Sequence, residues 1–394
     1  MKIAILTRSL PVHRTGGLET ATWDLARFLS LQGCRVFILT TAHPKGLPEE
    51  TRDGVTILYT PGTSPARYTP LFFSRLSRRI RLLHEREKLD IVHSEGFAGL
   101  TFSSPPDLPL VATLHGTLFS ETPLYREQFQ TFSPFEKLAA IWRYRWRIAI
   151  RPLYRRFLKR LDRIFVDSRF SLGETLRDVP GSRDKFRVVP LGIDVSHPPP
   201  LDRMAARKRL DLPLDRPVVF TLSRLEAMKG IDTALEAARA LENRDFLYLI
   251  GGEGRSRSRL EKKAKDLGLS TVRFPGRIPD NRLSDYFTAA DLFLYPEISQ
   301  PAFGLVSLEA MFHGCPVLGS DAGAIPEVVT PDKGWLFKRG DAADLAAKWE
   351  RILNRIPELR EKSEHLRRYV VEHFSLERFI GQTLEVYREV LEKR

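Results

Sequence analysis

The residues best suited to chemistry lie in a short segment of the second half of the chain, where two cations stand five residues apart. Arg224 and Lys229 follow the apolar run Val218–Leu222 and directly precede Gly230. A guanidinium offers a planar fork to phosphate oxygens, and an ammonium offers a compact point charge. The pair therefore predicts a phosphate-binding segment, although a basic loop with solvated side chains would have the same composition.

Two further segments place glycine where a strand would give way to a helix. Gly251–Gly254 would let the backbone approach a ligand, although many tight turns between strand and helix look alike. Gly304 precedes the apolar run Leu305–Met311, and the free N–H groups at the start of a helix can receive a phosphate. Glu309 lies inside that run, where a carboxylate suits paired ribose hydroxyls or is simply a good helix former on an amphipathic surface.

The elements that must position these residues alternate between short apolar strands and amphipathic helices. Near-continuous apolar runs are typical of a parallel sheet buried on both faces, and the alternation implies doubly wound α/β domains. Ligands bind beyond the carboxyl ends of such strands. We therefore predict two Rossmann-like domains facing an interdomain cleft. The predicted strands are 3–7, 35–40, 55–59, 90–93, 111–115, 163–166 and 186–189, then 218–222, 246–250, 272–274, 291–295 and 317–319.

The proline cluster Pro198–Pro200 interrupts this alternation and marks a linker. The chain has 394 residues, more than one hydrophobic core ordinarily serves. We predict an N-terminal, acceptor-side domain over residues 1–195 and a donor domain over 196–375. A C-terminal helix over 376–394 is expected to pack back on the first domain.

The net charge of +13 is concentrated in the first half of the chain. Residues 1–195 hold 30 Lys and Arg against 19 Asp and Glu, whereas residues 196–394 hold 32 against 30. Such a field attracts phosphorylated substrates or anionic lipid; nucleic acid is not expected, because no recognition motif accompanies the charge. Cys34 and Cys315 offer neither a metal spacing nor a disulfide framework, which favours a cytoplasmic location.

Taken together, these segments resemble the retaining glycosyltransferases of family four, which have the GT-B fold and belong to the glycosyl transferases of group 1. Order and spacing agree over almost the whole chain, most closely in the second half. The matching segments are Gly16-Gly17-Leu18-Glu19, His115-Gly116, Ser223–Gly230, Gly251–Gly254, Phe274–Ile278, Ala290–Pro296, Phe303–Met311 and Gly314–Val317.

The resemblance implies four catalytic residues. Arg224 and Lys229 would bind the donor diphosphate, Glu309 would hold the ribose, and His115 would reach the donor sugar. Glu19 would lie on the acceptor side. The other residues implied in donor binding are Gly16, Gly17, Ser223, Gly251, Glu253, Arg277, Ile278, Phe303, Gly304, Leu305 and Val306.

The implied reaction moves a hexose-type sugar from a nucleotide diphosphate sugar to a glycan or lipid-linked acceptor, with retention at the anomeric carbon. Negative charge grows on the departing phosphate, and the two cations and the helix N–H groups would stabilise it. The sequence shows no metal-ligand cluster, so neither a metal nor another cofactor is expected.

One position departs from the family pattern, which has two glutamates separated by seven residues. Eight positions before Glu309 stands Pro301. Glu297 and Gln300 lie nearby and are candidates to replace that glutamate, although neither is in register. The sugar is then held differently, or the protein is a nucleotide-sugar-binding, catalytically weakened subunit of a glycan assembly complex. A third hypothesis is an epimerase or a phosphorylase, and the segments Ser223–Gly230 and Phe303–Glu309 argue against it.

A basic and aromatic segment in the first half has no place in the donor site. Residues 126–163 hold 11 Lys and Arg against three acids. The predicted helix Trp142–Leu161 could lie on an anionic membrane surface, peripherally on its inner face, or could be an ordinary helix with aromatic side chains in the core. The candidate membrane contacts are Trp142, Arg143, Arg147, Arg151 and Arg155.

Overall fold

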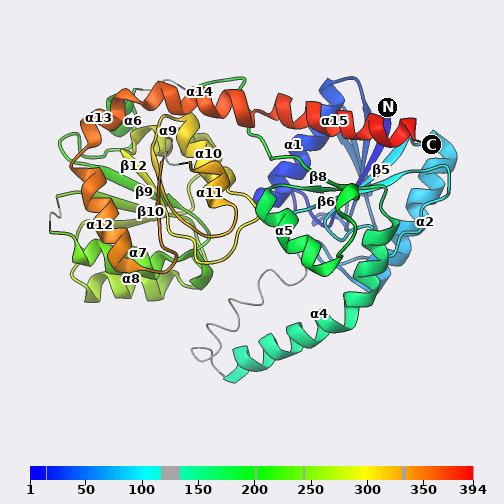
Figure 1. Cartoon of the computed structure of the whole chain (residues 1–394), viewed down its shortest axis with the longest axis horizontal. Coiled ribbons are helices and arrows are strands. Elements are labelled where there is room, and N and C mark those ends of the chain that lie inside the picture. The colour runs from blue at the N-terminus through cyan, green and yellow to red at the C-terminus, as the bar shows by residue number, and fades with distance from the viewer. Residues whose placement is uncertain (15, 117–133, 200–201, 243–244, 331–333, 394) are drawn as a thin grey trace. The chain divides into compact units, whose positions relative to one another are not determined.

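The structure is a computed structural model that describes residues 1–14, 16–116, 134–199, 202–242, 245–330 and 334–393. It divides into two compact units, each built around its own sheet (Figure 1). Unit 1 comprises Met1–Gly192 and Leu376–Arg394, and unit 2 comprises Ile193–Ser375. The division lies three residues before the boundary expected at 195/196. The C-terminal segment belongs to unit 1.

Unit 1 contains an eight-stranded sheet in the order β3-β4-β2-β1-β5-β6-β7-β8. All neighbours are parallel except the hairpin of β3 and β4. The central strand β1 pairs Ile3 with Val36 on one side and with Ile91 on the other. The strands are β1 Lys2–Leu6, β2 Arg35–Thr40, β3 Glu49–Arg52, β4 Val55–Tyr59, β5 Ile91–Glu95, β6 Leu110–Leu114, β7 Arg163–Val166 and β8 Phe186–Val188.

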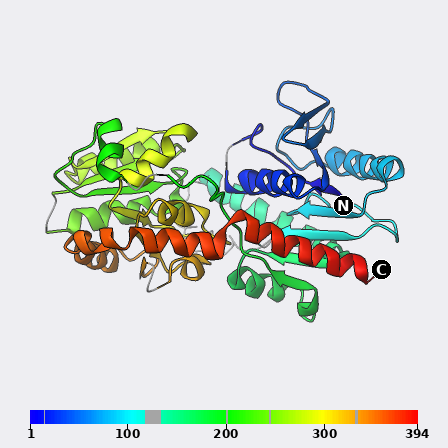
Figure 2. The same cartoon turned by 90° about the horizontal axis from the view of Figure 1, so that it is seen from above.

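The helices of unit 1 cover this sheet, and they include the last helix of the chain. Helix α15 packs against α1, and both belong to the unit that carries the two termini in Figure 2. The side chain of Tyr387 on α15 is buried. Helix α4 buries Tyr154, Phe157 and Leu158 in the core, while its N-terminal half extends beyond the sheet (Figure 1). The helices are α1 Gly17–Leu31, α2 Pro70–Glu87, α4 Pro134–Arg160, α5 Arg169–Asp178, the short 3₁₀ helix η2 Arg183–Lys185 and α15 Leu376–Glu392.

Unit 2 contains a six-stranded, wholly parallel sheet in the order β11-β10-β9-β12-β13-β14. The strands are β9 Val218–Leu222, β10 Leu247–Gly251, β11 Val272–Gly276, β12 Leu292–Tyr295, β13 Val317–Ser320 and β14 Gly334–Phe337. The helices are α6 Arg203–Arg209, η3 Ala227–Lys229, α7 Ile231–Ala240, α8 Arg257–Asp266, α9 Asp280–Ala289, α10 Leu305–Phe312, α11 Ile325–Val328, α12 Ala342–Leu353, α13 Ile356–Glu361 and α14 Ser363–Phe374.

The strand order reverses direction in each sheet, and that reversal positions the loops of interest. In unit 2 the chain runs outward from β9 through β10 and β11, then returns to place β12 on the other side of β9. The loops after β9 and β12 therefore leave the sheet in opposite directions, which opens the crevice where α/β proteins bind ligands. In unit 1 the same reversal separates β1 from β5.

All twelve predicted strands are present to within two residues, and two strands were not predicted. Strand β3 is a polar edge strand whose sequence, EETR, carries no apolar alternation. Strand β14, with the sequence GWLF, is short and begins with a glycine. Among the described helices none has the length and apolar character needed to cross a membrane.

A buried ion pair closes the amino end of the sheet in unit 2. Arg207 and Asp291 are both 0% exposed and form a salt bridge. Asp291 also accepts a hydrogen bond from the backbone N–H of Val218 at 2.8 Å and from the guanidinium of Arg360 at 2.9 Å. Arg207 additionally donates to the carbonyl of Ala289 at 3.0 Å. These bonds join α6, the starts of β9 and β12, and α13.

We expect Arg207→Ala to lower the free energy of unfolding of unit 2 by about 3–5 kcal/mol, because it leaves the Asp291 carboxylate buried without its closest cation. Urea denaturation followed by tryptophan fluorescence measures the change. Arg209→Ala, two residues along the same helix, removes an exposed pair with Asp285 and should change stability little. Equal losses in the two variants would contradict the importance of the buried pair.

Candidate functional site

The loops that follow β9 and β10 are joined at the carboxyl edge of the sheet in unit 2. The backbone N–H of Ser223 donates to the carbonyl of Gly251 at 3.1 Å, and that of Leu225 donates to the carbonyl of Glu253 at 2.8 Å. The side chains of Arg224 and Glu253 are both exposed. The two predicted segments thus form one structure, in which the backbone of Glu253 supports the segment that carries Arg224.

Glycines permit this close approach, and their positions leave no room for a side chain. A Cβ on Gly252 would lie 1.9 Å from the carbonyl oxygen of Ser223, and Gly252 has a φ of 118°. A Cβ on Gly230 would lie 1.7 Å from the carbonyl oxygen of Pro296, and Gly230 has a φ of 65°. Gly230 therefore lets the segment with Lys229 pack directly against the end of β12.

Lys229 is held by a carboxylate that the sequence had suggested for a different task. Its Nζ donates to Oε2 of Glu297 at 2.5 Å, and the Glu297 side chain is 0% exposed, whereas that of Lys229 is 22% exposed. The other oxygen of Glu297 accepts hydrogen bonds from the backbone N–H and the hydroxyl of Ser299. An ammonium has three N–H donors, so this bond fixes Lys229 and still leaves donors for a ligand.

Position 301, where the family pattern has its first glutamate, has a structural role in this chain. The carbonyl of Pro301 accepts a hydrogen bond from the N–H of Ala324 at 2.9 Å. A Cβ on Gly323 would lie 2.5 Å from the same oxygen, so the two segments are in close contact. Both carboxylate oxygens of Glu297 already have protein partners. The Glu297 side chain is also 0% exposed, so in this arrangement it supports Lys229, and a contact of Glu297 with a sugar stays a prediction.

Helix α10 begins beside the same strand end. Gly304 precedes its first residue without a side-chain cap, and the ring of Tyr295, the last residue of β12, lies 3.4 Å from where a Cβ on Gly304 would be. The first N–H groups of a helix, here from Leu305 and Val306, have no partner within the helix and carry the positive end of its dipole. This N-terminus and Lys229 thus both lie at the end of β12, an arrangement suited to an anion.

The remaining predicted donor-binding residues of unit 2 lie around these loops. Ile278 is buried, and its Cδ1 lies 2.6 Å from where a Cβ on Gly251 would be, so the two residues are in contact. Arg277 is exposed beside it. Phe303 is buried against the ring of Phe374. Glu309 is half-buried in the middle of α10.

In unit 1 the loop after β1 is organised around Glu19. Gly16 directly precedes α1, Gly17 is its first residue, and a Cβ on Gly16 would lie 2.6 Å from Oε2 of Glu19. The other carboxylate oxygen of Glu19 accepts hydrogen bonds from Ser9 Oγ and Arg14 Nε, both at 2.6 Å. Glu19 is only 2% exposed. Its observed partners are therefore those of a residue that holds the loop, and an acceptor-side role stays a prediction.

His115 follows β6 and lies between two carboxylates that the sequence did not predict to be part of the site. Its Nε2 is 2.6 Å from Oε2 of Glu95, and its Nδ1 is 2.9 Å from Oδ2 of Asp167. Burial alone would lower the pKa of His115, but these carboxylates raise it well above its usual value. Glu95 ends β5 and Asp167 follows β7, so an acidic residue at the end of each neighbouring strand was the available signal.

No group of three or more His, Cys, Asp or Glu side chains that could hold a metal ion is found in the described part of the chain. The predicted site residues form two separate sets, one in each unit. One set surrounds the ends of β9, β10 and β12 in unit 2. The other surrounds the ends of β1 and β6 in unit 1.

Comparisons with known proteins agree with this architecture. The family model described as Glycosyltransferase Family 4 matches residues 15–197, and the model described as Glycosyl transferases group 1 matches residues 202–370. A D-inositol 3-phosphate glycosyltransferase from Acidothermus cellulolyticus is 29% identical over 96% of this chain and 87% of its own.

Solved structures show the same fold at lower sequence identity. Sucrose-phosphate synthase from Thermosynechococcus elongatus has a TM-score of 0.83 at 22% identity, with 100% of both chains covered. The Anabaena protein Alr3699/HepE, in complex with UDP-glucose, has a TM-score of 0.75 at 22% identity, with 99% of this chain and 100% of that chain covered. The fold is therefore GT-B, with two Rossmann-like units.

We expect Gly252→Ala to weaken binding of a nucleoside diphosphate at least tenfold, because the added Cβ would force the β9 and β10 loops apart. Isothermal titration calorimetry with UDP, GDP and ADP measures the affinity. Gly268→Ala is the matched control, since Gly268 also has a positive φ, 67°, but nothing lies within 4 Å of its Cβ position. That control should cost about 1 kcal/mol of stability through backbone strain and leave affinity unchanged. Unchanged affinity in Gly252→Ala would exclude these loops from the binding site.

Proposed function

Because the chain belongs to the family-four, group 1 glycosyltransferases, we propose that it moves a hexose-type sugar from a nucleoside diphosphate to a glycan or lipid-linked acceptor with retention at the anomeric carbon. The observation that carries the proposal is the convergence at the end of β12. Lys229, held by Glu297, and the N-terminus of α10 both lie there. Arg224 is exposed on the loop after β9.

This arrangement suits stabilisation of a departing diphosphate. Breaking the bond between the anomeric carbon and the phosphate oxygen leaves positive charge on the sugar ring and negative charge on the phosphate. Cations and helix N–H groups that are already in place stabilise that charge without reorganising during the reaction. Glu297 contributes by restricting the long Lys229 side chain to one position, which lowers the entropy lost when a phosphate binds.

The same cations support transfer without a metal ion. A divalent ion in such a reaction would screen the diphosphate, and a guanidinium and an ammonium can supply that positive charge. Glu309, half-buried on α10, would hold the ribose hydroxyls. The contact between Ile278 and Gly251 would provide an apolar surface for the base. Alr3699/HepE, which has the same fold, was solved in complex with UDP-glucose. A uridine nucleotide is therefore the first donor to test.

A binding subunit with little turnover is not favoured as the alternative. The curated relatives are named as enzymes, among them the inositol phosphate glycosyltransferase and an alpha-maltose-1-phosphate synthase. Pro301 then means that the donor sugar is held by groups other than a glutamate at that position. Its carbonyl is engaged by Ala324, so the hydroxyl contacts must come from other parts of the chain.

We expect Lys229→Ala and Arg224→Ala each to lower kcat by about a hundredfold or more, because each removes a charge that stabilises the departing phosphate. Sugar transfer is measured with UDP-glucose and related donors in excess EDTA, and the anomeric configuration of the product is read by NMR. Lys348→Ala, which removes a half-exposed lysine of α12, is the control and should retain full activity. Activity that requires a divalent ion would refute metal independence, and full activity in Lys229→Ala would refute the role of that cation.

For the acceptor side we extend the proposal to contact with an anionic membrane through the N-terminal half of α4. Leu138, Trp142 and Trp146 are spaced four residues apart on this helix and are 66%, 67% and 49% exposed. Residues at that spacing share one face of a helix. Arg145, three residues after Trp142, adds a cation to this face, as expected for a helix that lies on anionic lipid. The side chain of Arg143 lies outside the described residues.

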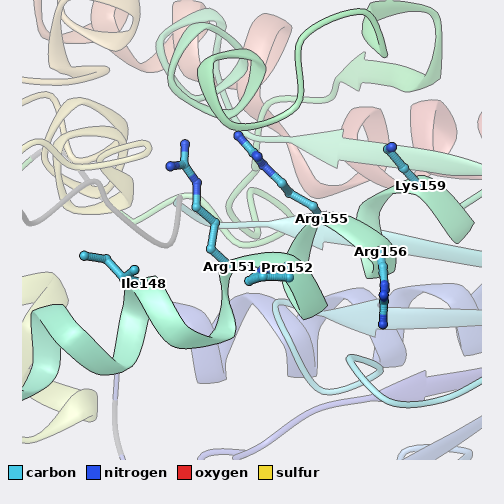
Figure 3. A pocket seen from close by; sticks show the side chains of 6 residues that line it. All are labelled: Ile148, Arg151, Pro152, Arg155, Arg156 and Lys159. Carbon is cyan, nitrogen blue, oxygen red and sulfur yellow. The ribbon is translucent and has the colours of Figure 1, made fainter.

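The C-terminal half of α4 makes a basic recess beside Pro152 (Figure 3). Arg151 and Arg155 point the same way from the helix, whereas Arg156 points the opposite way (Figure 3). Both Arg151 and Arg155 contact Asp178 at the end of α5, at 3.5 and 3.0 Å. These two arginines therefore anchor α4 to the unit, and the membrane proposal depends chiefly on the aromatic face.

We expect the double substitution Trp142→Glu and Trp146→Glu to abolish flotation with anionic vesicles, because it places two carboxylates on the apolar face. Leu82→Glu, at a 53% exposed position on α2, is the matched control and should float like the unmodified protein. Neutral vesicles should bind neither. Flotation that is unaffected by the double substitution, or absent from anionic vesicles altogether, would refute membrane contact through α4.

A further inference from the structure

A cluster of buried titratable side chains surrounds His115 at the carboxyl ends of β5, β6 and β7. Its members include Glu95 and Asp167, which are 3% and 1% exposed, and His93, which is 1% exposed. The His115 side chain is 17% exposed, so among these four residues it is the one that a ligand at the surface can contact. We infer that Glu95 and Asp167 are positioning residues that hold His115 as a doubly protonated imidazolium, so that His115 serves sugar transfer as a fixed positive charge. The inference rests on the proposed function.

The hydrogen-bond geometry requires this protonation state when both carboxylates are ionised. An ionised carboxylate can only accept hydrogen bonds, and a neutral imidazole carries only one N–H. Both ring nitrogens of His115 lie within 2.9 Å of a carboxylate oxygen. Both must therefore carry a proton. A ring whose two N–H groups are engaged in this way cannot accept a proton from an acceptor hydroxyl.

The second histidine of the cluster stays neutral. Burial lowers the pKa of His93 to about 4. Its Nδ1 bonds to the hydroxyl of Tyr387 on α15, and its Nε2 lies 2.6 Å from the hydroxyl of Thr113. Burial raises the pKa of Tyr387, so this phenol keeps its proton and donates a hydrogen bond to Nδ1 of His93. His93 then donates from Nε2, and His115 supplies the positive charge between the two carboxylates.

The two carboxylates depend on that charge in different degrees. Burial opposes ionisation of Glu95, but its hydrogen bond to His115 keeps the pKa of Glu95 below its usual value. Burial raises the pKa of Asp167. Its Oδ1 is buried without a hydrogen-bond partner among the described residues. A buried carboxylate with one unsatisfied oxygen needs the adjacent imidazolium, so Asp167 and His115 stabilise each other's charged forms.

The titratable groups around the cluster come from several elements. Strand β5 contributes His93 and Glu95, the residue after β7 contributes Asp167, and α15 contributes Tyr387. Tyr68, whose pKa burial raises to about 12, interacts with Glu95 and lies 5.1 Å from the guanidinium of Arg8. A neutral phenol there adds no charge, so the balance at His115 is set by the two carboxylates.

The sign of the pH dependence follows from the raised pKa of His115. The imidazolium and its stabilising effect are fully present below the pKa of a free histidine, and they are lost as pH rises through the raised value. The rate of sugar transfer should therefore hold across neutral pH and fall on the alkaline side. Replacing either carboxylate by its amide removes one of the two negative charges that favour the imidazolium, so the fall should begin at lower pH.

Histidine-selective isotope labelling and NMR test the charge state without any turnover. The protein has nine histidines, and His115→Gln assigns the resonance. In the unmodified protein the titration midpoint of His115 should lie well above that of a free histidine, and in Glu95→Gln and Asp167→Asn it should fall toward the free value. Glu389→Gln, which removes a half-exposed α15 carboxylate bonded to Arg187, should leave it unchanged. Circular dichroism confirms that each variant is folded.

The pH profile of kcat then tests the role of the charge. We expect the alkaline limb of Glu95→Gln to shift in parallel with the NMR midpoint, with the KM for the donor little changed. A His115 midpoint near 6.5 in the unmodified protein, or equal midpoints in all variants, would overturn the assigned charge state. A shifted midpoint with an unshifted rate profile would overturn its role in transfer. A protein that transfers no sugar from any donor would refute the proposed function, while the NMR titration still decides the charge state.

Discussion

The ion pair between Lys229 and the fully buried Glu297 is the interaction on which the candidate donor site of unit 2 depends. A carboxylate with no exposed surface is strongly unfavourable unless a cation and further donors satisfy it. Lys229 and Ser299 meet that requirement. The 3₁₀ turn over Ala227–Lys229 must therefore pack against the end of β12, and Gly230 is the residue that lets the two backbones meet. The position of the cation thus follows from where the carboxylate is buried.

The same physical arrangement, a buried carboxylate that holds a cation, is found elsewhere in the molecule. In unit 1 the buried Glu95 and Asp167 hold His115, and at the amino end of the sheet in unit 2 the buried Asp291 holds Arg207. The difference between these clusters lies in what remains exposed. Arg207 is 0% exposed and can act only in stability, whereas His115 and Lys229 keep 17% and 22% of their side chains exposed. A partly exposed cation held by a buried carboxylate has a fixed position and can still meet a ligand.

Pro301 is a departure from the family pattern at a single position of these loops. The loops after β9, β10 and β12 are joined by backbone hydrogen bonds that do not depend on the side chain at position 301. Its carbonyl is used to join the segment to Ala324. The side chain at position 301 is therefore not among the groups that support Arg224, Lys229 and the N-terminus of α10.

The sequence by itself determined the two-domain α/β fold, because strands buried on both faces must be nearly continuous apolar runs and such runs are visible without a structure. It also singled out Arg224, Lys229 and Gly304 as candidates, because cations and glycines that directly follow a strand can approach a ligand, and their role in binding stays a prediction. It could not identify β3, whose polar residues carry no alternation, or the partners of the site residues. The sequence suggested Glu297 as a candidate for a sugar contact, and it did not single out Glu95 or Asp167 for any role. Only the tertiary structure decided that all three are buried beside cations, because burial and pairing join residues far apart in the chain: 68 positions separate Lys229 from Glu297, and 52 separate His115 from Asp167.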